Sequence, residues 1–338
     1  MIKWSKLSDI KALAGTLTIR RLINLWWLGL GYLSYLVTKR TFNPGLPFAI
    51  AIEPTTSCNL RCPECPTGTR SLKRPKGFIN MDLYRYIIDQ MSSHLIYLTL
   101  YFQGEPYLHP GFHSLVTYAH NKKIYVATST NGHYLDEANA EATVRSGLNK
   151  LIVSLDGTDQ ETYSSYRKAG EFNIVTKGVE RLAKWKRKLG VRHPYIIIQF
   201  LVLSTNEHQV ESIKKLGLEL GADEVQLKTA QLNSFKYGNL LMPEDKKLSG
   251  YNLSPDGTFK PAGRLRNRCT RMWASPVITW DGDLVPCCFD KDSEHKLGNI
   301  ESGNFKEIWN SAEYKKFRAQ IRHSRKSVEM CCNCNQRW

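Results

Sequence analysis

Residues 48–65 read FAIAIEPTTSCNLRCPEC, and this stretch decides how the rest of the chain is interpreted. The apolar run FAIAI is typical of a buried strand. Cys58, Cys62 and Cys65 follow it in a C-x3-C-x2-C pattern, and the next cysteine is Cys269. Structural zinc sites use four ligands, typically in two pairs. Three thiolates on one short loop can instead hold three irons of a four-iron cluster and leave the fourth iron open to a small molecule.

The composition supports bound metal in a large α/β protein. The chain has 338 residues, nine cysteines and a formal net charge of +16, from 47 basic and 31 acidic side chains. An odd number of cysteines in so large a chain is a poor disulfide framework, and clustered thiols in a reducing cytosol indicate metal. The basic excess favours an anionic substrate, an acidic partner, a membrane surface or nucleic acid, or reflects only a solvated surface.

Short β-rich runs alternate with amphipathic helical patterns from residue 48 onward. The β-rich runs are 48–52, 96–102, 124–128, 151–155, 195–203 and 224–228. The helical patterns are 81–93, 111–121, 136–147, 171–189 and 206–220, several of them ending at glycine. Six βα units in a row predict a parallel sheet with helical crossovers, as a partial barrel or an open doubly wound sheet.

Unusual polar segments directly follow the first four predicted strands. The cysteine loop follows the first strand and QGEP (103–106) the second, while STNG (129–132) ends the third and SLDG (154–157) the fourth. Asn-Gly and Asp-Gly alone are common turns. Because α/β barrels build their active sites at the carboxyl ends of the strands, four such segments around one mouth predict a catalytic site.

These segments resemble the motifs of the radical S-adenosylmethionine (SAM) superfamily, over roughly residues 48–230. The cysteine loop matches the cluster motif, QGEP is similar to the Gly-Gly-Glu-Pro motif, and the TNG and SLDG segments fit the third and fourth strands. The resemblance implies an enzyme with a partial (β/α)6 TIM-like barrel, a [4Fe–4S] cluster and bound SAM. In this family one electron cleaves SAM to methionine and a 5′-deoxyadenosyl radical, which abstracts hydrogen from the substrate.

The resemblance also implies where SAM binds. Glu105 and its neighbouring backbone receive the SAM ammonium group, and Asn131 and Ser154 face the ribose. Arg167 neutralises the SAM carboxylate, or is a surface arginine on a helix. A glutamine replaces the first glycine of the motif, and Glu64 stands where an aromatic residue often packs on adenine, which puts that contact in doubt. The implied cofactor-binding residues are Gln103, Gly104, Glu105, Pro106, Asn131, Ser154, Asp156 and Arg167.

A second set of cysteines occupies the C-terminal third. Cys269 is followed by twelve residues, a glycine, four residues and Cys287, and the stretch 280–283 is typical of a hairpin turn that presents Cys287 beside Cys269. With the later C-x2-C, this pattern resembles the SPASM and twitch extensions of radical SAM enzymes. The resemblance implies one auxiliary [4Fe–4S] cluster, and a four-cysteine zinc site is the alternative. Its implied ligands are Cys269, Cys287, Cys331 and Cys334.

Cys288 and Cys332 remain after this assignment. Cys288 adjoins a ligand of the auxiliary cluster, where related enzymes place an acid/base residue or a hydrogen-atom donor, and we predict it as the catalytic residue. Donation from its thiol makes the reaction redox-neutral, such as an epimerisation. If the auxiliary cluster takes the second electron, the result is a dehydrogenation or a new bond. Either cysteine can instead be a misassigned ligand or a buried apolar filler.

The N-terminal segment combines apolar and basic residues. Residues 22–38 are uncharged, include two tryptophans and have basic flanks. The run is at the lower limit for a bilayer span, and its polar residues argue against spanning. Two interpretations stay open: a helix lying in a membrane interface, or a helix docked on the protein. The basic flanks favour anionic lipid and membrane contact through residues 20–40. The polar stripe of the helical wheel contains Asn24, Gly31, Ser34 and Thr38.

The predicted organisation is a basic and apolar amphipathic region at 1–43, a radical SAM partial barrel at 44–260 and a SPASM/twitch-like domain at 261–338. The predicted substrate is an anionic small molecule, a sugar or a lipid-linked molecule, which undergoes oxidation, epimerisation or bond formation. A peptide-modifying SPASM maturase is the alternative. It is placed second because such enzymes usually carry a leader-binding domain, and residues 1–43 are too short and too apolar for one.

Two further classes of protein are alternatives. Cysteines, positive charge and aromatic residues are compatible with a zinc-stapled nucleic-acid-binding protein, but the basic residues are spread along the chain and no recognition motif is present, so no nucleic acid is expected. The intact cysteine loop and Glu105 argue against a degenerate, inactive relative. The expected partner is a flavodoxin- or ferredoxin-type reductant, and the expected location is the cytoplasm, at the inner face of the membrane if residues 20–40 contact lipid.

Overall fold

The computed structural model describes residues 4–38, 43–263 and 265–334. A sheet of nine strands in the order β11-β10-β9-β1-β2-β3-β4-β5-β6 organises the fold. The first six strands pair in parallel, as the sequence predicts. They are β1 (Ala49–Ile52), β2 (Tyr97–Thr99), β3 (Tyr125–Thr130), β4 (Lys150–Ser154), β5 (Tyr195–Val202) and β6 (Glu224–Thr229). The predicted fold class, an α/β protein with a partial barrel, is confirmed.

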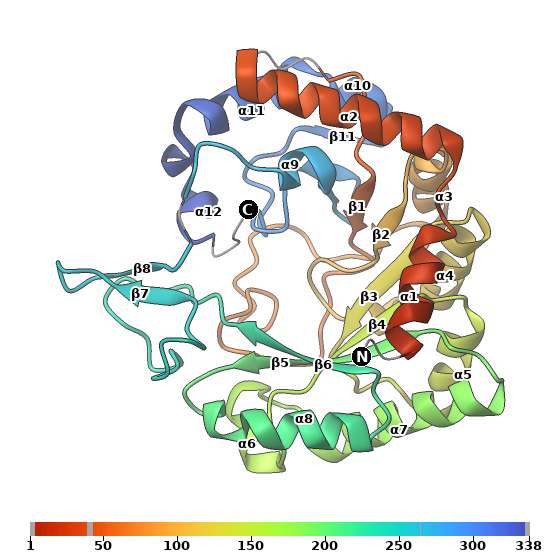
Figure 1. The fold of residues 1–338 in the computed structure, drawn as a ribbon, viewed down its shortest axis with the longest axis vertical. Coiled ribbons are helices and arrows are strands. Elements are labelled where there is room, and N and C mark those ends of the chain that lie inside the picture. The colour runs from red at the N-terminus through yellow and green to blue at the C-terminus, as the bar shows by residue number, and fades with distance from the viewer. Residues whose placement is uncertain (1–3, 39–42, 264, 335–338) are drawn as a thin grey trace.

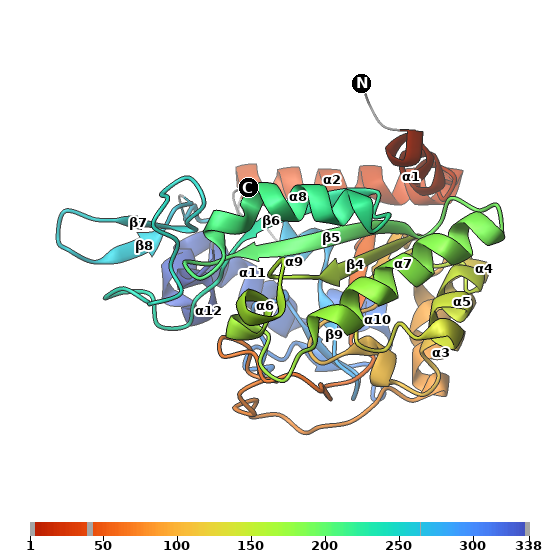
Figure 2. The same ribbon diagram turned by 90° about the horizontal axis from the view of Figure 1, so that it is seen from below.

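Helices cover the outer face of this curved sheet (Figures 1 and 2). They are α3 (Met81–Met91), α4 (Phe112–Asn121), α5 (Glu137–Arg145), α6 (Gln160–Tyr166), α7 (Phe172–Lys188) and α8 (Val210–Glu219). Side-chain caps begin three of them: Asn80, Asp136 and Asp159 each accept a hydrogen bond from a backbone N–H of the first turn. The sequence patterns did not predict α6, which forms its own short helix before α7.

Alternate strand residues separate the core from an open space. In β5, Ile196, Ile198 and Phe200 are fully buried in the core that the helices share. Gln199 and Leu201, on either side of Phe200 in sequence, point to the other face and line a central cavity. This alternation follows from the period of two along a strand. Smaller or polar residues on the inner face leave room for ligands inside the sheet.

The C-terminal part of the chain extends the same sheet. β9 (Val277–Ile278) pairs in parallel with β1, and β10 (Asp283–Val285) folds back antiparallel through the predicted turn, where Gly282 has φ +83°. β11 (Gly298–Asn299) completes the sheet. The sheet therefore continues across the predicted boundary at residue 260. The other C-terminal elements are β7 (Tyr251–Leu253), β8 (Phe259–Pro261), α9 (Arg271–Ala274), α10 (Phe305–Trp309), α11 (Ala312–Ser324) and α12 (Glu329–Cys332).

Two helices precede the barrel, α1 (Trp4–Ala14) and α2 (Ile19–Thr38). α2 lies along one edge of the molecule (Figure 1) and docks on it through buried side chains. The Asn24 amide exchanges two hydrogen bonds of 2.8 Å with the backbone of Leu46, and the Tyr35 hydroxyl donates to the carbonyl of Arg318 at 3.1 Å. Among the described helices, none is long and apolar enough to cross a membrane.

Candidate active site

A cavity of about 480 Å³ opens at the carboxyl ends of the parallel strands. All three cysteines of the loop after β1 line it, together with Cys288 from the C-terminal part. Every implied cofactor-binding residue except Pro106 also lines it: Gln103, Gly104, Glu105, Asn131, Ser154, Asp156 and Arg167. Pro106 is buried at the start of a short 3-10 helix. The structure therefore brings the motifs of four strands to one cavity.

The cysteine loop is held by backbone contacts. The Glu105 N–H donates to the Ser57 carbonyl at 2.7 Å, which ties the loop to the QGEP segment. Gly104 makes this close approach possible: it has φ +73°, and a Cβ there would lie 2.4 Å from the Thr55 carbonyl oxygen. The same backbone conformation is costly for any side chain.

The donor set of this loop fits an iron–sulfur cluster. All nine cysteines are free thiols, and burial raises the pKa of Cys58 to about 11. A bound metal would deprotonate the thiols that ligate it. Within the described residues, no three Cys, His, Asp or Glu side chains converge closely enough for a single metal ion. Three thiols around one cavity are the donors that a [4Fe–4S] cluster takes from a protein.

Glu105 is engaged with the end of β3. Its carboxylate accepts hydrogen bonds from the Thr130 hydroxyl and the Asn131 N–H, both at 2.7 Å, and from the Tyr107 N–H at 3.2 Å. Burial raises the pKa of Glu105 to about 7. Glu105 thus joins the cysteine loop to β3, and it lines the cavity in which the SAM ammonium group is predicted to bind.

Arg167 and Asp156 form an ion pair beside the loop. Arg167 Nε donates to Asp156 Oδ2 at 2.5 Å, and its Nη1 lies 3.8 Å from Cys62 Sγ. The other Asp156 oxygen accepts from the Leu201 N–H at 2.7 Å. The Arg167 side chain is 18% exposed, so it is not a surface arginine. The pair fixes a positive charge next to the cysteine loop, where an anionic cluster or the SAM carboxylate would be stabilised.

Two amide contacts complete the cysteine loop. Asn131 Nδ2 donates to Asn59 Oδ1 at 2.8 Å, which joins the end of β3 to the loop. Glu64 accepts hydrogen bonds from the Asn233 N–H at 2.7 Å and from Asn239 Nδ2 at 3.1 Å. Glu64 therefore ties the loop to the segment after β6. This is the structural role of Glu64, which stands where the family often has an aromatic residue.

The second cysteine set surrounds a separate, smaller cavity. Cys269, Cys287, Cys331 and Cys334 line a space of about 20 Å³ with Arg271, Phe289, Arg325 and Met330. Arg325 is buried and donates to Cys334 Sγ at 3.3 Å. A buried guanidinium among thiols is a counter-charge for anionic thiolates. The four implied ligands thus meet in one place with a positive charge beside them, as an auxiliary cluster requires.

Cys288 lies between the two cavities. Arg271 Nη1 donates to Cys288 Sγ at 3.0 Å, and Arg271 and Phe289 line both cavities. Cys332 is exposed and donates to the Lys326 carbonyl at 3.2 Å, away from both cavities. Of the two remaining cysteines, the structure thus places the one predicted as catalytic in the active-site cavity.

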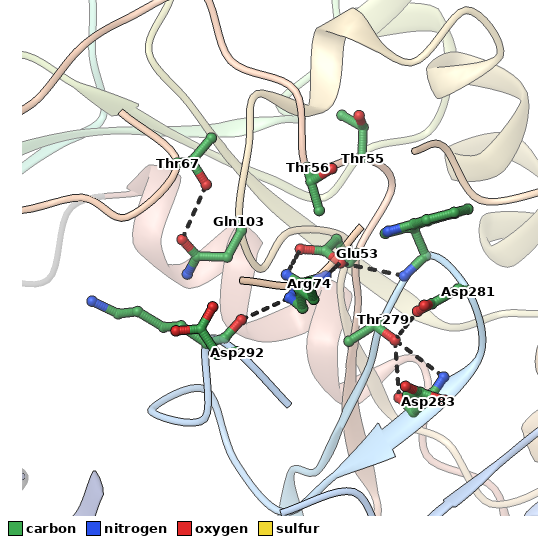
Figure 3. A network of polar contacts seen from close by, with 12 residues as sticks. Glu53, Thr55, Thr56, Thr67, Arg74, Gln103, Thr279, Asp281, Asp283 and Asp292 are labelled. Atoms are coloured by element: carbon green, nitrogen blue, oxygen red, sulfur yellow. Dashed lines mark hydrogen bonds and ion pairs between the residues drawn. The ribbon is translucent and has the colours of Figure 1, made fainter. Parts of the chain in front are cut away.

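A buried polar network joins the cysteine loop to the C-terminal part (Figure 3). Arg74 Nη1 donates to Glu53 Oε2 at 2.6 Å, and a second Arg74 nitrogen contacts the other Glu53 oxygen. Arg74 Nε also donates to the Lys291 carbonyl at 2.7 Å, and the Trp280 N–H reaches Glu53 at 3.3 Å. This network, the Arg74–Glu53 latch, connects β1, the loop beyond the cysteines and the β9–β10 hairpin.

The sequence did not identify several of the polar residues of the cavity. Lys228, Arg271 and Lys291 line it beside Arg167, so four basic side chains stand with three acidic ones, Glu64, Glu105 and Asp156. Lys228 sits near the carboxyl end of β6, so the strand-end rule that selected the other segments would have found it. Burial lowers the pKa of Lys228. Arg271 begins the short helix α9 and Lys291 lies in an irregular segment, both near cysteines, and no sequence pattern identified them.

Comparison with known proteins agrees with this geometry. The family model described as the radical SAM superfamily matches residues 52–217, and the SPASM model, described as an iron–sulfur cluster-binding domain, matches residues 269–335. A cofactor-modifying protein for the tungsten-containing aldehyde ferredoxin oxidoreductase of Pyrococcus furiosus is 24% identical over 79% of this chain and 82% of its own length.

Two further proteins are similar. The mycofactocin maturase MftC of Mycobacterium ulcerans is 27% identical over 80% of this chain and 77% of its own length. The crystal structure of SuiB from Streptococcus suis, bound to the precursor peptide SuiA, has a TM-score of 0.63 at 14% identity and covers 89% of this chain and 72% of that one. The cofactors are therefore SAM, the [4Fe–4S] cluster that binds it, and auxiliary iron–sulfur binding in the SPASM domain. The chain is an enzyme of the radical SAM superfamily with a C-terminal SPASM domain.

Proposed function

We propose that this enzyme is a peptide maturase, which abstracts hydrogen from a residue of a peptide substrate. The support is its similarity to a protein named as a maturase. The predicted anionic small-molecule, sugar or lipid-linked substrate is the second candidate. It is favoured by the four basic side chains that line the cavity, Arg167, Lys228, Arg271 and Lys291, and by a relative named for cofactor modification.

The arrangement of the cavity carries the proposal. It holds the cysteine loop at one side and Cys288 at the other, and it has a volume of about 480 Å³. That volume is typical of pockets for one small ligand, roughly 300–1,000 Å³. The cluster and SAM would occupy part of this space, so we propose that only the reacting residue of a peptide enters it. The remainder of a peptide would lie outside the cavity.

A strand edge beside the cavity suits an extended peptide. β6 ends the sheet, and in the described part of the chain no strand pairs with its outer edge. Lys228 and Thr229 at its end line the cavity. Peptides commonly bind by adding a strand to an exposed edge, with backbone hydrogen bonds for affinity and side-chain pockets for specificity. A peptide on β6 would lead one residue toward the cysteine loop.

When bound, the cluster and SAM supply one-electron hydrogen abstraction from the substrate. The residues of this chain then decide the outcome. Cys288 gives its sulfur-bound hydrogen to the substrate carbon radical: the S–H bond breaks, a C–H bond forms and a thiyl radical remains on Sγ. One further electron from the reductant and one proton from water restore the thiol. The substrate is neither oxidised nor reduced, and inversion at the carbon is an epimerisation.

The electron donor is proposed to be an acidic flavodoxin- or ferredoxin-type protein. A groove of about 490 Å³ lies against the cysteine loop and is lined by Cys58, Arg61, Arg70 and Lys76. The three basic side chains are exposed, so an acidic carrier would be steered to them. The cytoplasmic location and the domain division at residues 43 and 260 stay predictions.

The substrate class is tested by coupling SAM cleavage to added compounds. Reduced, reconstituted enzyme is incubated with a pool of random peptides or with a pool of anionic sugars and phosphorylated lipids. We expect 5′-deoxyadenosine formation to rise with peptides, with one modified peptide for each 5′-deoxyadenosine. Stimulation by the anionic pool alone would overturn the peptide proposal and support the second candidate.

The role of Cys288 is tested in deuterated water, where its thiol carries deuterium. The wild-type enzyme is expected to leave deuterium on the product carbon, because the hydrogen comes from an exchangeable thiol. Cys288→Ala should still form 5′-deoxyadenosine but lose this label, while Cys332→Ala, a matched thiol outside the cavities, should keep it. Labelling by Cys288→Ala at the wild-type level would exclude the thiol as the donor.

A further inference from the structure

The two N-terminal helices carry an exposed apolar surface that the catalytic site does not use. More than half of the exposed large apolar side chains of the described chain fall within residues 7–37. Trp26 is 60% exposed and Ile19 is 78% exposed. We call this set the α1–α2 apolar face; its members are Leu7, Ile10, Leu13, Leu17, Ile19, Leu22, Ile23, Trp26, Trp27, Leu30, Leu33 and Val37.

α2 buries polar residues against the protein and exposes large apolar ones, unlike an ordinary surface helix. Such a helix ordinarily turns its apolar stripe to the core and its polar side to water. Here Asn24 and Gly31, from the polar stripe, are buried against the protein, whereas Trp26 and Leu33 face outward. Asn24 and Gly31, together with the buried Leu28 and Tyr35, dock the helix, and the face that carries Trp26 and Leu33 is left exposed.

Specific contacts prevent α2 from rolling its apolar face inward. Asn24 pairs with the Leu46 backbone, and the Arg21 guanidinium donates to the carbonyls of Thr16, Ser92 and Lys123. Gly45 packs so close that a Cβ there would lie 2.4 Å from the Leu28 nitrogen. The helix is therefore locked with its apolar face outward.

The charges around this face are positive. The only acidic residue among positions 1–43 is Asp9. Its carboxylate pairs with Lys150 at 3.0 Å, so it does not oppose an anionic surface. The basic residues of the same segment are Lys3, Lys6, Lys11, Arg20, Arg21, Lys39 and Arg40. A second copy of the chain is disfavoured on this surface, because two such faces would bring like charges together.

A basic pocket adjoins the start of α2. It has a volume of about 400 Å³, and Arg20, Lys122 and Lys123 line it together with Ser92 and Ser93. The Lys122 ammonium pairs with Asp89 at 2.6 Å, so Arg20 and Lys123 supply the positive charge of the pocket. Ile19, the most exposed member of the apolar face, also lines it. A lipid phosphate accepts hydrogen bonds from cationic groups and hydroxyls such as these. The acyl chains of the lipid would then lie against the neighbouring apolar residues.

We propose that the α1–α2 apolar face docks on an anionic phospholipid bilayer, with α2 lying in the plane of the interface. A helix of 20 residues is about 30 Å long, so it presents an extended contact to the membrane surface. Trp26 and Trp27, whose ring centroids are 4.7 Å apart, lie at the headgroup level that tryptophan prefers. The basic pocket binds a lipid phosphate at the start of the helix.

Vesicle flotation tests this proposal with the full-length protein. Vesicles of phosphatidylcholine alone are compared with vesicles of equal parts phosphatidylcholine and phosphatidylglycerol. We expect binding to the anionic vesicles that weakens as salt is raised. Trp26→Ser/Leu33→Ser should weaken binding at least tenfold, since both side chains already face outward and their change leaves the core intact. Leu218→Ser, an exposed apolar residue on α8, is the matched control and should bind as the wild type does.

Arg20→Glu/Lys123→Glu tests the basic pocket and is expected to abolish the preference for anionic vesicles. Absence of vesicle binding would overturn the proposal, and so would equal binding to both vesicle types. A concentration-dependent dimer that Trp26→Ser/Leu33→Ser dissociates, in a protein that does not float with vesicles, would assign the face to a second copy instead.

Discussion

Breaking the Arg74–Glu53 latch is expected to cost more stability than any surface ion pair of this protein. In the Arg74→Met variant, Glu53 stays fully buried and loses its charged partner, keeping backbone contacts such as the hydrogen bond from the Trp280 N–H at 3.3 Å. Removing one partner of a buried ion pair typically costs about 3–5 kcal/mol, because the other charge is left uncompensated. At about 1.4 kcal/mol for each factor of ten, the ratio of folded to unfolded protein falls by a factor of roughly 10²–10³.

The magnitude follows from the burial of both groups. The side chains of Arg74 and Glu53 are 7% and 0% exposed, so water cannot replace the lost partner. Arg74→Met also removes the hydrogen bond to the Lys291 carbonyl. Arg85→Met is the matched control: Arg85 lies 3.8 Å from Asp82, and these side chains are 54% and 88% exposed. An exposed pair of this kind contributes about 0–1 kcal/mol.

Equilibrium urea denaturation, followed by tryptophan fluorescence and circular dichroism, measures these changes. Coincident transitions of the two signals are required for a single free energy of unfolding. We expect Glu53→Gln/Arg74→Met to recover much of the loss, because the double variant buries no unpaired charge. A loss below about 1 kcal/mol in Arg74→Met, or a double variant no more stable than the single one, would refute the reasoning.

Three further predictions follow from the site and the buried groups. Gly104→Ala is expected to lower the iron held per chain, because its Cβ would meet the Thr55 carbonyl at 2.4 Å; wild-type iron content would contradict this. Cys287→Ser should lose about four irons and still form 5′-deoxyadenosine, whereas loss of both would contradict separate clusters. Burial lowers the pKa of His94 and His193, so the unfolded chain binds protons first as pH falls. Because the raised pKa of Glu105 acts in the opposite direction, the histidine contribution is measured as a difference: relative to the wild type, the urea midpoint of His94→Gln/His193→Gln should rise as pH falls below about 6.5, and a difference that does not change with pH would contradict this.

The strand-end rule explains why much of the site was predictable. Parallel strands bring their carboxyl ends to one edge, so a motif after each strand identifies neighbours without knowledge of the loops between them. The cysteine loop, Gln103, Asn131 and Ser154 were found in this way and line one cavity. The same rule applied to the sixth strand would have included Lys228.

The rest depended on tertiary partners that no local pattern reveals. Arg74 lies in an irregular segment, and its partners Glu53 and Lys291 come from opposite ends of the chain. The helical wheel identified the polar stripe of α2, but the side that faces the protein is decided by contacts such as Asn24 with the Leu46 backbone. The hydrogen bonds of Glu105 to the end of β3 likewise arise only in the folded chain, and its contact with the SAM ammonium group stays a prediction.

The structure also changes how the two parts of the enzyme are related. β9 pairs with β1 in the same sheet, and Arg271 lines both cavities. The SPASM part is thus continuous with the barrel, and the segment that carries Cys288 forms a wall of the active-site cavity. This continuity is what allows one thiol to lie between the two sets of cluster ligands.

Iron and sulfide analysis of the anaerobically reconstituted wild type and of the Cys58→Ala/Cys62→Ala/Cys65→Ala variant tests the central claim most directly. Both proteins are then given SAM and dithionite. We predict about eight irons per chain in the wild type and about four in the variant, with 5′-deoxyadenosine formed by the wild type alone. Stoichiometric zinc with little iron, and no 5′-deoxyadenosine from the wild type, would contradict the account.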